Sequence, residues 1–309
     1  SVVFSHAYAG ACVSGRKSHA WPGMTACHRP MGPACLALYL PRRCGGVHPL
    51  TLARLYLENR KRLAHFHQCG VFLTASEWMA DVYRRQGLGD RVRRVHLPVP
   101  PPPGASPDNP APPDGEVRLL FLGRIAPEKG GRMLIQAAPR VAAALNQPVQ
   151  VTLAGDGPDR ESWQREAEAV AARHPRVSVR LTGWVDAIRR GQLLRDSHLL
   201  VVPSLWPEPF GQVGLEAGHF GVPSAAYALG GIPSWLEEGR NGALAPADPA
   251  TIEGLAEAIV RCLADPAHYR RLAAGAREAA AQHSLARHLR ELEEAFDRAR
   301  AAHRRASAR

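Results

Sequence analysis

Five short apolar runs, separated by helical patterns, constrain the second half of the chain most strongly. They read VRLLFLG at 117–123, VQVTLAG at 149–155, VSVRLTG at 177–183, HLLVVPS at 198–204 and VPSAAYA at 222–228. Near-continuous apolar strands that alternate with helices are typical of a parallel sheet buried on both faces. Three more helical patterns follow, at 249–264, 266–281 and 284–301. We predict a doubly wound α/β domain whose ligands bind outside the carboxyl ends of the strands.

A proline-rich segment precedes this pattern. Residues 98–113 hold nine of the 27 prolines, so they can form neither a helix nor a central strand. Before it we expect a strand at the very start, a loop region rich in Gly, Cys and Pro, a helix from Leu50, a strand at 70–76 and a helix at 77–87. Ser1 opens within a strand-like run, and we therefore expect the first domain to be incomplete. The expected parts are a partial domain at 1–98, a linker at 99–115, a doubly wound, ligand-binding domain at 116–283, and a helix at 284–309 that is a candidate to cross back to the first domain.

Positive charge is concentrated in the first segment. Residues 1–98 hold 14 basic and four acidic residues, whereas residues 99–309 hold 25 and 24. A basic face attracts nucleic acid, anionic lipid or an acidic substrate. No helix-turn-helix or aromatic-interleaved pattern occurs, so we expect no nucleic-acid partner. The basic tract at 51–67 is either a contact for an anionic membrane or a solvated helix face.

Other sequence features bear on the cellular location of the protein and on metal binding. The sequence has no stretch of 18 apolar residues, and we expect no membrane-spanning helix. Its six irregularly spaced cysteines form no disulfide framework, which favours the cytoplasm, with peripheral membrane contact left open. Cys27, His28, Cys35 and Cys44 match no paired CxxC pattern of a zinc site. We therefore expect no metal and interpret the cysteines as buried thiols.

The loop after the first apolar run, GRIAPEKGG at 123–131, carries two cations. Arg124 and Lys129 precede a helix start at Gly130 and Gly131, where free amides and the helix dipole favour an anion. Only three of the 39 basic residues are lysines, so the choice of Lys129 is informative. A compact ammonium suits a leaving phosphate. The alternative is a pair of solvated loop cations.

The next two strand ends carry glycines. Gly155, Asp156 and Gly157 form a turn in which Asp156 is a plausible helix cap. The turn is not GxGxxG, which argues against a dinucleotide dehydrogenase. Gly183 and Trp184 close the third run, where they either edge a nucleobase or contribute a core tryptophan.

The fourth run leads into PSLWPEPFGQVGLEAG at 203–218, with two glutamates eight positions apart. Pro203, Pro207 and Pro209 force an extended loop, which places Glu208 at the pocket. Phe210 and Gly211 are expected to start a helix with free amides, and Glu216 to lie two turns along it. A carboxylate accepts two hydroxyl hydrogens at once, which suits a ribose diol.

These motifs, in this order at strand ends, resemble the retaining family 4 glycosyltransferases. The family pattern E-P-F-G-x-x-x-L-E is matched in full from Glu208 to Glu216, and ALGGIPSWLEEGRNGAL at 228–244 and ADPATIEGLAEAIVRCLADP at 247–266 match its later part. The resemblance is strong over residues 117–296. It is loose over residues 1–98, through SHAYAG and TASEWMADVYRRQGLGDRVRRVHLPV. It implies the GT-B fold, two Rossmann-like doubly wound domains that face a cleft, with the first one partial here.

The resemblance also implies roles. Glu216 holds the nucleotide ribose, and Glu208 contacts the donor sugar near the reacting carbon. Arg124 and Lys129 neutralise the departing diphosphate, assisted by the amides of Phe210 and Gly211, without a metal. The remaining implied site residues are His6 on the acceptor side and Gly155, Asp156, Gly157, Gly183 and Trp184 around the nucleotide.

The implied activity is the transfer of a sugar from a nucleotide-diphosphate sugar to a hydroxyl of a glycan, a lipid-linked molecule or a small molecule. The transfer is expected to retain configuration and to need neither a metal nor a cofactor. Alternatives are a truncated, inactive nucleotide-binding remnant or another GT-B enzyme such as an epimerase. A sugar phosphorylase is disfavoured because none of the three lysines is suitably placed for pyridoxal. His28 is either an acceptor-side residue or a loop residue. The sequence departs from the family pattern at Gly218-His219-Phe220 and at Ser234, and both departures bear on how the donor sugar is bound.

Overall fold

The computed structural model describes residues 1–105 and 110–307, and the chain divides into two compact units. The first comprises Ser1–Pro98, Trp206–Phe210 and Ser284–Arg309, and the second comprises Val99–Leu205 and Gly211–His283. Residues 106–109 of the expected linker and residues 308–309 of the expected last helix lie outside the described residues. The short segment with Glu208 thus belongs to the first unit, although the chain on both sides of it belongs to the second.

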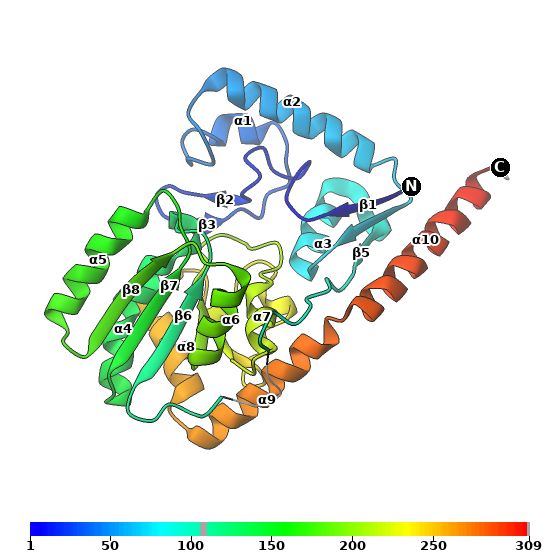
Figure 1. The fold of residues 1–309 in the computed structure, drawn as a ribbon. Helices are drawn as coiled ribbons and strands as arrows, with labels where there is room; N and C mark the ends of the chain where they lie inside the picture. The colour runs from blue at the N-terminus through cyan, green and yellow to red at the C-terminus, as the bar shows by residue number, and fades with distance from the viewer. Residues whose placement is uncertain (106–109, 308–309) are drawn as a thin grey trace. The chain divides into compact units, whose positions relative to one another are not determined.

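The second unit is built on one six-stranded sheet, whose strand order is β11-β10-β9-β6-β7-β8 (Figure 1). All its neighbouring strands are parallel, which confirms the predicted parallel sheet. The five apolar runs form five of its strands, whereas β11 was not predicted. The strands are β6 (Val117–Leu122), β7 (Val149–Ala154), β8 (Val177–Gly183), β9 (Leu199–Val202), β10 (Ser224–Tyr227) and β11 (Gly242–Ala245).

Helices lie on both faces of this sheet (Figure 1). They are α4 (Gly131–Leu145), α5 (Arg160–Arg173), α6 (Ala187–Asp196), α7 (Val213–Gly218), α8 (Ile252–Leu263) and α9 (Pro266–Gln282). α4 packs against α5 and α8 on one face, while α6 and α7 contact strands from the other and α9 packs on α7. Because both faces are covered, β9 and β10 are buried at every position.

The strand order places the reversal of the sheet at β6. Its neighbour on one side is β7, the next strand in the chain, and on the other side it is β9. In open α/β sheets ligands bind at the carboxyl ends of the strands beside such a reversal. The loops that follow β6, β7, β8 and β9 are therefore where a ligand site is expected.

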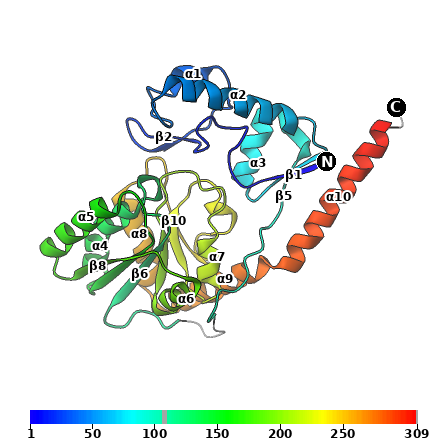
Figure 2. The ribbon, with the colours of Figure 1, turned by 45° about the horizontal axis from the view of Figure 1, so that its top comes forward.

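The first unit has a smaller parallel sheet in the order β1-β4-β5. β1 (Val2–Ser5) and β4 (Val71–Thr74) fall at predicted strands, and β5 (Val92–Arg94) was not predicted. Its helices are α1 (Ala34–Leu38), α2 (Pro49–Phe66), α3 (Glu77–Tyr83) and α10 (Leu285–Ser307). Both views show α1 beside α2 (Figure 2). β2 (Ser18–His19) and β3 (Thr25–Ala26) form a separate antiparallel pair.

Alternate residues of β4 pack on opposite faces of this small sheet. Val71 and Leu73 join a cluster with Ala295 and Ala299 of α10, whereas Phe72 joins the cluster around Met79 and Tyr83 of α3. α10 is also tied by Glu291, whose two carboxylate oxygens contact the backbone nitrogen of His96 at 2.6 Å and its Nδ1 at 2.8 Å. No helix among the described residues combines the length and the apolar character needed to cross a bilayer.

Candidate functional site

The second unit has a pocket of about 410 Å³ at the carboxyl ends of its strands. Residues from the ends of β6, β7 and β8 and from α6 and α7 line it. They are Leu122, Gly123, Arg124, Ala154, Gly155, Asp156, Trp184, Val185, Arg190 and Val213. Four residues selected from the sequence, Arg124, Gly155, Asp156 and Trp184, are thereby brought together, and Arg190 was not anticipated. Gly157, Gly183, Lys129 and Glu216 are not among the lining residues.

Backbone hydrogen bonds join the three strand-end loops. The amide of Gly123 donates to Ala154 at 3.0 Å, that of Ile125 to Asp156 at 2.9 Å, and that of Gly155 to Gly183 at 2.9 Å. Gly155 has a φ of +149°, and a Cβ there would lie 1.8 Å from the oxygen of Gly123. Only glycine permits so close an approach, so the GDG turn is a packing requirement as well as a turn signal.

The basic loop after β6 has an acidic member that sequence reasoning missed. The guanidinium of Arg124 donates to the carboxylate of Glu128, which is buried, while the Arg124 side chain is 60% exposed. The Glu128 carbonyl also accepts from Leu205 at 2.9 Å. The Arg124 side chain is therefore held toward its own loop by Glu128, while much of it stays exposed and accessible to a ligand. The i,i+4 spacing of the pair was the available signal. Lys129 is half-buried in the turn Pro127–Lys129 that leads to α4.

Two predictions at the next loops need correction. Asp156 does not cap α5, because the N-cap residue is Asp159, and the Asp156 carboxylate instead accepts from the amide of Gly157 at 2.8 Å. Trp184 is 75% exposed, so the alternative of a core tryptophan is wrong. Its large ring at a pocket mouth is available to a flat ligand.

The helix that carries Glu216 begins later than expected. α7 starts at Val213 with Gln212 as its N-cap, so Phe210 and Gly211 do not start it, and Glu216 lies one turn along it rather than two. The Glu216 side chain is 17% exposed and its Oε2 lies 3.4 Å from Nη1 of Arg190. The ribose carboxylate implied by the resemblance thus has a cationic neighbour at the pocket.

The departure from the family pattern after Glu216 has a packing explanation. A Cβ on Gly218 would meet the carbonyl oxygen of Ala276 in α9 at 2.5 Å. The ring Nε2 of His219 contacts the carbonyl of Val99 at 2.7 Å, and Phe220 is buried. These three residues therefore fit α7 to its own neighbours within the second unit.

Glu208 is held within the first unit. The residue is 7% exposed, and its carboxylate accepts from the indole Nε1 of Trp206 at 2.9 Å. The Tyr8 hydroxyl donates to the Pro207 carbonyl at 2.7 Å, and the Ser76 hydroxyl donates to the Pro209 carbonyl at 2.6 Å. Burial, and then the charge of Glu208, raise the pKa of Tyr8. Tyr8 and Ser76 were not selected from the sequence. Tyr8 lies in SHAYAG and Ser76 lies in TASEW, and both stretches have a loose family resemblance.

The other two selected residues of the first unit are Phe210 and His6. Phe210 is 3% exposed. His6 is exposed directly after β1, with its ring centroid 4.3 Å from that of Phe4. His28 is exposed beside Trp78 and follows β3, which is not a strand of the parallel sheet. The roles assigned to these three residues stay predictions.

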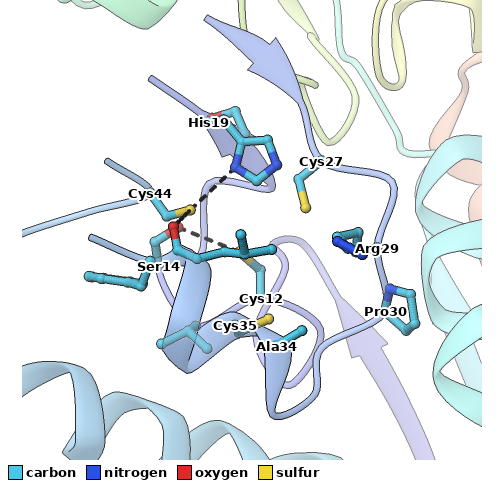
Figure 3. Close-up of a pocket in the computed structure, with 13 residues that line it drawn as sticks. Cys12, Ser14, His19, Cys27, Arg29, Pro30, Ala34, Cys35 and Cys44 are labelled. Atoms are coloured by element: carbon cyan, nitrogen blue, oxygen red, sulfur yellow. Dashed lines mark hydrogen bonds between the residues drawn. The ribbon is translucent and has the colours of Figure 1, made fainter. Parts of the chain in front are cut away.

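Four cysteines line a small pocket of the first unit. Cys12, Cys27, Cys35 and Cys44 surround it together with His19, not with His28 (Figure 3). They are half-buried rather than buried as expected, and Nδ1 of His19 lies 3.3 Å from the Cys44 sulfur. Burial, then neighbouring thiols, raise the pKa of Cys44 to about 11, and burial lowers the pKa of His19. Within the described part of the chain, no three His, Cys, Asp or Glu side chains are grouped as metal ligands.

The two α/β units and the pocket at the strand ends define the class of protein, which is one with the GT-B architecture. Solved structures with the same fold include HepE from Anabaena, described in complex with UDP and glucose, with a TM-score of 0.63 and 20% identity over 77% of this chain and 66% of that one. Sucrose-phosphate synthase from Thermosynechococcus elongatus matches with a TM-score of 0.62 and 25% identity over 81% of this chain and 62% of that one.

The sequence comparison gives the family. The family model of the glycosyl transferases group 1 matches residues 105–279, and the chain belongs to that family. Glycogen synthase of Mycobacterium tuberculosis is 35% identical over 167 residues, which are 53% of this chain and 38% of that protein. The α-D-kanosaminyltransferase of Streptomyces kanamyceticus is 32% identical over 158 residues, which are 51% and 39%. The chain thus spans less than half the length of these relatives.

Proposed function

We propose that the protein transfers a sugar from a nucleoside-diphosphate sugar to a hydroxyl group, with retention of configuration and without a metal. The observation that carries this proposal is the pocket at the ends of β6, β7 and β8, which combines a cation, backbone turns and an exposed aromatic ring. Family membership supports glycosyl transfer, and UDP in the structural relative HepE supports a nucleotide donor.

On the donor side, each end of the nucleotide meets a different kind of group. Trp184 and the backbone at Gly183 would border the base, and the Glu216 carboxylate would accept the ribose hydroxyl hydrogens. Arg124 and Lys129 would face the diphosphate. A charge-assisted contact to a leaving phosphate strengthens as negative charge develops on it, so these cations would lower the barrier to bond cleavage. Such stabilisation by fixed cations is what supports a metal-independent reaction.

On the sugar side, Glu208 is the residue assigned to the donor sugar near the reacting carbon. Its burial and its bond from Trp206 hold the carboxylate in one orientation, which favours a contact that matters as the glycosidic bond breaks. The nucleophile would be a hydroxyl of a glycan, a lipid-linked molecule or a small molecule, with His6 on the acceptor side. The proposed retention of configuration rests on the match between residues 208–216 and the pattern of the retaining family.

Calorimetry on the full chain with UDP, GDP and ADP tests this proposal, beside assays of donor hydrolysis and sugar transfer. We expect one nucleotide to bind and transfer to persist in excess EDTA. If no nucleotide binds, the pocket is not a donor site and the proposal fails. If a nucleotide binds but neither hydrolysis nor transfer occurs, the protein is a nucleotide-binding remnant. Complete loss of transfer in EDTA would overturn metal independence.

A cytoplasmic location with peripheral membrane contact is a further part of the proposal. α2 carries Arg54, Arg60, Lys61 and Arg62, and its Leu57 is 58% exposed. A basic helix with exposed apolar side chains attracts an anionic lipid surface. We expect co-sedimentation with vesicles that contain phosphatidylglycerol at low salt. Equal sedimentation with pure phosphatidylcholine vesicles would show that α2 is an ordinary solvated helix.

A further inference from the structure

The ion pair between Arg190 and Glu216 has unmet bonding capacity. Nη1 of Arg190 lies 3.4 Å from Oε2 of Glu216, which is longer than the usual 2.7–2.9 Å of a charge-assisted hydrogen bond. Glu216 Oε2 and Arg190 Nε are both buried without a hydrogen-bond partner. The Glu216 side chain is 17% exposed while Oε2 is buried, so its exposed part is not Oε2. One oxygen therefore faces Arg190, which leaves Oε1 as the candidate acceptor for a ligand.

Packing sets the positions of the two helices independently of this pair. α6 is capped by Asp186, whose carboxylate accepts from the amide of Arg189 at 2.7 Å. A Cβ on Gly191 would lie 2.3 Å from the Pro103 carbonyl oxygen, and one on Gly214 of α7 would lie 1.9 Å from the Trp235 ring. These close contacts, one with a backbone carbonyl and one with a buried ring, leave little freedom for either helix to shift. Arg190 is thus presented to Glu216 by a rigid frame.

The other arginines of α6 have different partners. Arg189 donates to Gln192 at 2.9 Å, and Arg195 donates to the carbonyl of Gly104. Of the three, only Arg190 lines the pocket at the strand ends. The same side chain therefore borders the ligand space and neutralises the carboxylate assigned to the ribose.

We infer that Arg190 is a positioning residue for ribose recognition: it turns the Glu216 carboxylate so that Oε1 receives the ribose hydroxyls. This inference rests on the proposed function, since it needs a nucleotide in the pocket. Without the guanidinium, the carboxylate would lose its orienting charge and would turn about its terminal torsion, which has no sharp minimum. The contact with the ribose would then be made in only a fraction of the molecules.

The readout is the ribose preference, not affinity alone. We would measure the Kd values of UDP, GDP and ADP and of their 2′-deoxy counterparts by calorimetry. A hydrogen bond to a charged group contributes about 1.5–3 kcal/mol, which corresponds to roughly 10- to 150-fold in Kd. We therefore expect the wild-type protein to prefer the ribonucleotide by about tenfold or more. Arg190→Ala should reduce this preference to about threefold or less, and Arg190→Lys should restore part of it.

Arg189→Ala is the matched control, because it removes an arginine from the same helix without touching Glu216, and it should keep the wild-type preference. Melting curves show whether each variant is folded. If Arg190→Ala is not, Arg190→Gln keeps most of the side-chain length, removes the charge and carries the same expectation. A wild-type preference near one, or an Arg190 variant that keeps the full preference, overturns the inference while nucleotide binding stands. Absence of binding by the wild type overturns the donor site itself.

Discussion

Replacing glycines of the GDG turn by alanine should destabilise the second unit far more than replacing Gly239, which has open space around it. Three sites separate the two physical causes. Gly239 has a φ of +72° with nothing within 4 Å of an added methyl group, so Gly239→Ala measures the backbone cost alone. Gly157 has no positive φ, but its Cβ would lie 2.2 Å from the oxygen of Ile125. Gly155 combines a φ of +149° with a contact of 1.8 Å to the oxygen of Gly123.

The magnitudes follow from these geometries. A left-handed conformation costs an L-residue about 1–2 kcal/mol, and the stiffer unfolded chain returns about 0.4–1 kcal/mol, so Gly239→Ala should lose about 1 kcal/mol. In Gly157→Ala the backbone must separate by more than 1 Å to reach the 3.4 Å of ordinary contact. That shift breaks the bonds between Ile125 and the GDG turn, and each orphaned buried group costs about 1–3 kcal/mol. We expect about 3 kcal/mol for Gly157→Ala and about 4 kcal/mol or more for Gly155→Ala.

Urea unfolding of the full chain is followed by far-UV circular dichroism and by tryptophan fluorescence. The transition midpoints give the difference in free energy of unfolding between each variant and the wild type. Trp163 is fully buried in the second unit and reports on its unfolding. Nucleotide affinity should fall in Gly155→Ala and Gly157→Ala but not in Gly239→Ala, because only the first two lie in the loops of the pocket. Stability losses within about 1 kcal/mol of one another for all three variants would refute the close-approach argument.

Three further expectations concern charge. Glu216→Ala should mainly weaken nucleotide binding, whereas Glu208→Gln should mainly lower turnover; equal losses of nucleotide affinity would contradict this division. Lys129→Ala should cost about 2–3 kcal/mol of transition-state stabilisation, measured as kcat, and Arg173→Ala, on the surface of α5, should cost nothing measurable. Burial and an adjacent guanidinium lower the pKa of His198 from 6.5 to about 4, so the unfolded chain takes up a proton before the folded one as the pH falls. The free energy of unfolding should therefore decline as the pH falls from 6.5 to about 4. The His198→Gln variant should lose this decline, and a decline of the same size in the variant would show that other groups cause it.

The parallel sheet of the second unit could be predicted because its central strands are largely apolar, a pattern that burial on both faces imposes, whereas the edge strand β8, VSVRLTG, has exposed polar positions. The strand β11, GALA, was missed because it is four residues long and only weakly apolar. β5, VRR, was missed because two arginines hide a strand that pairs with β4. Short strands derive their stability from the neighbour with which they pair, and that neighbour is not visible in local sequence.

The candidate site was predictable where a local motif carries it and not where distant segments meet. Arg124 and the glycines of the GDG turn stand at strand ends, and the strand-end rule selected them. Arg190 was missed because its importance depends on the packing of α6 beside α7, which no spacing between Arg190 and Glu216 encodes. Tyr8 was missed for the same reason, since its partner Pro207 is 199 positions away.

The motif from Glu208 to Glu216 joins two kinds of local structure, and this explains its composition. Prolines at 207 and 209 have no N–H, and their carbonyl oxygens accept from the hydroxyls of Tyr8 and Ser76 in the first unit. The part after Gly211 is helical, and its small residues allow close packing in the second unit. Glu208 is therefore oriented by one unit and Glu216 by the other. Because the supports are separate, loss of the Tyr8 hydroxyl should disturb Glu208 and leave the ion pair of Glu216 intact.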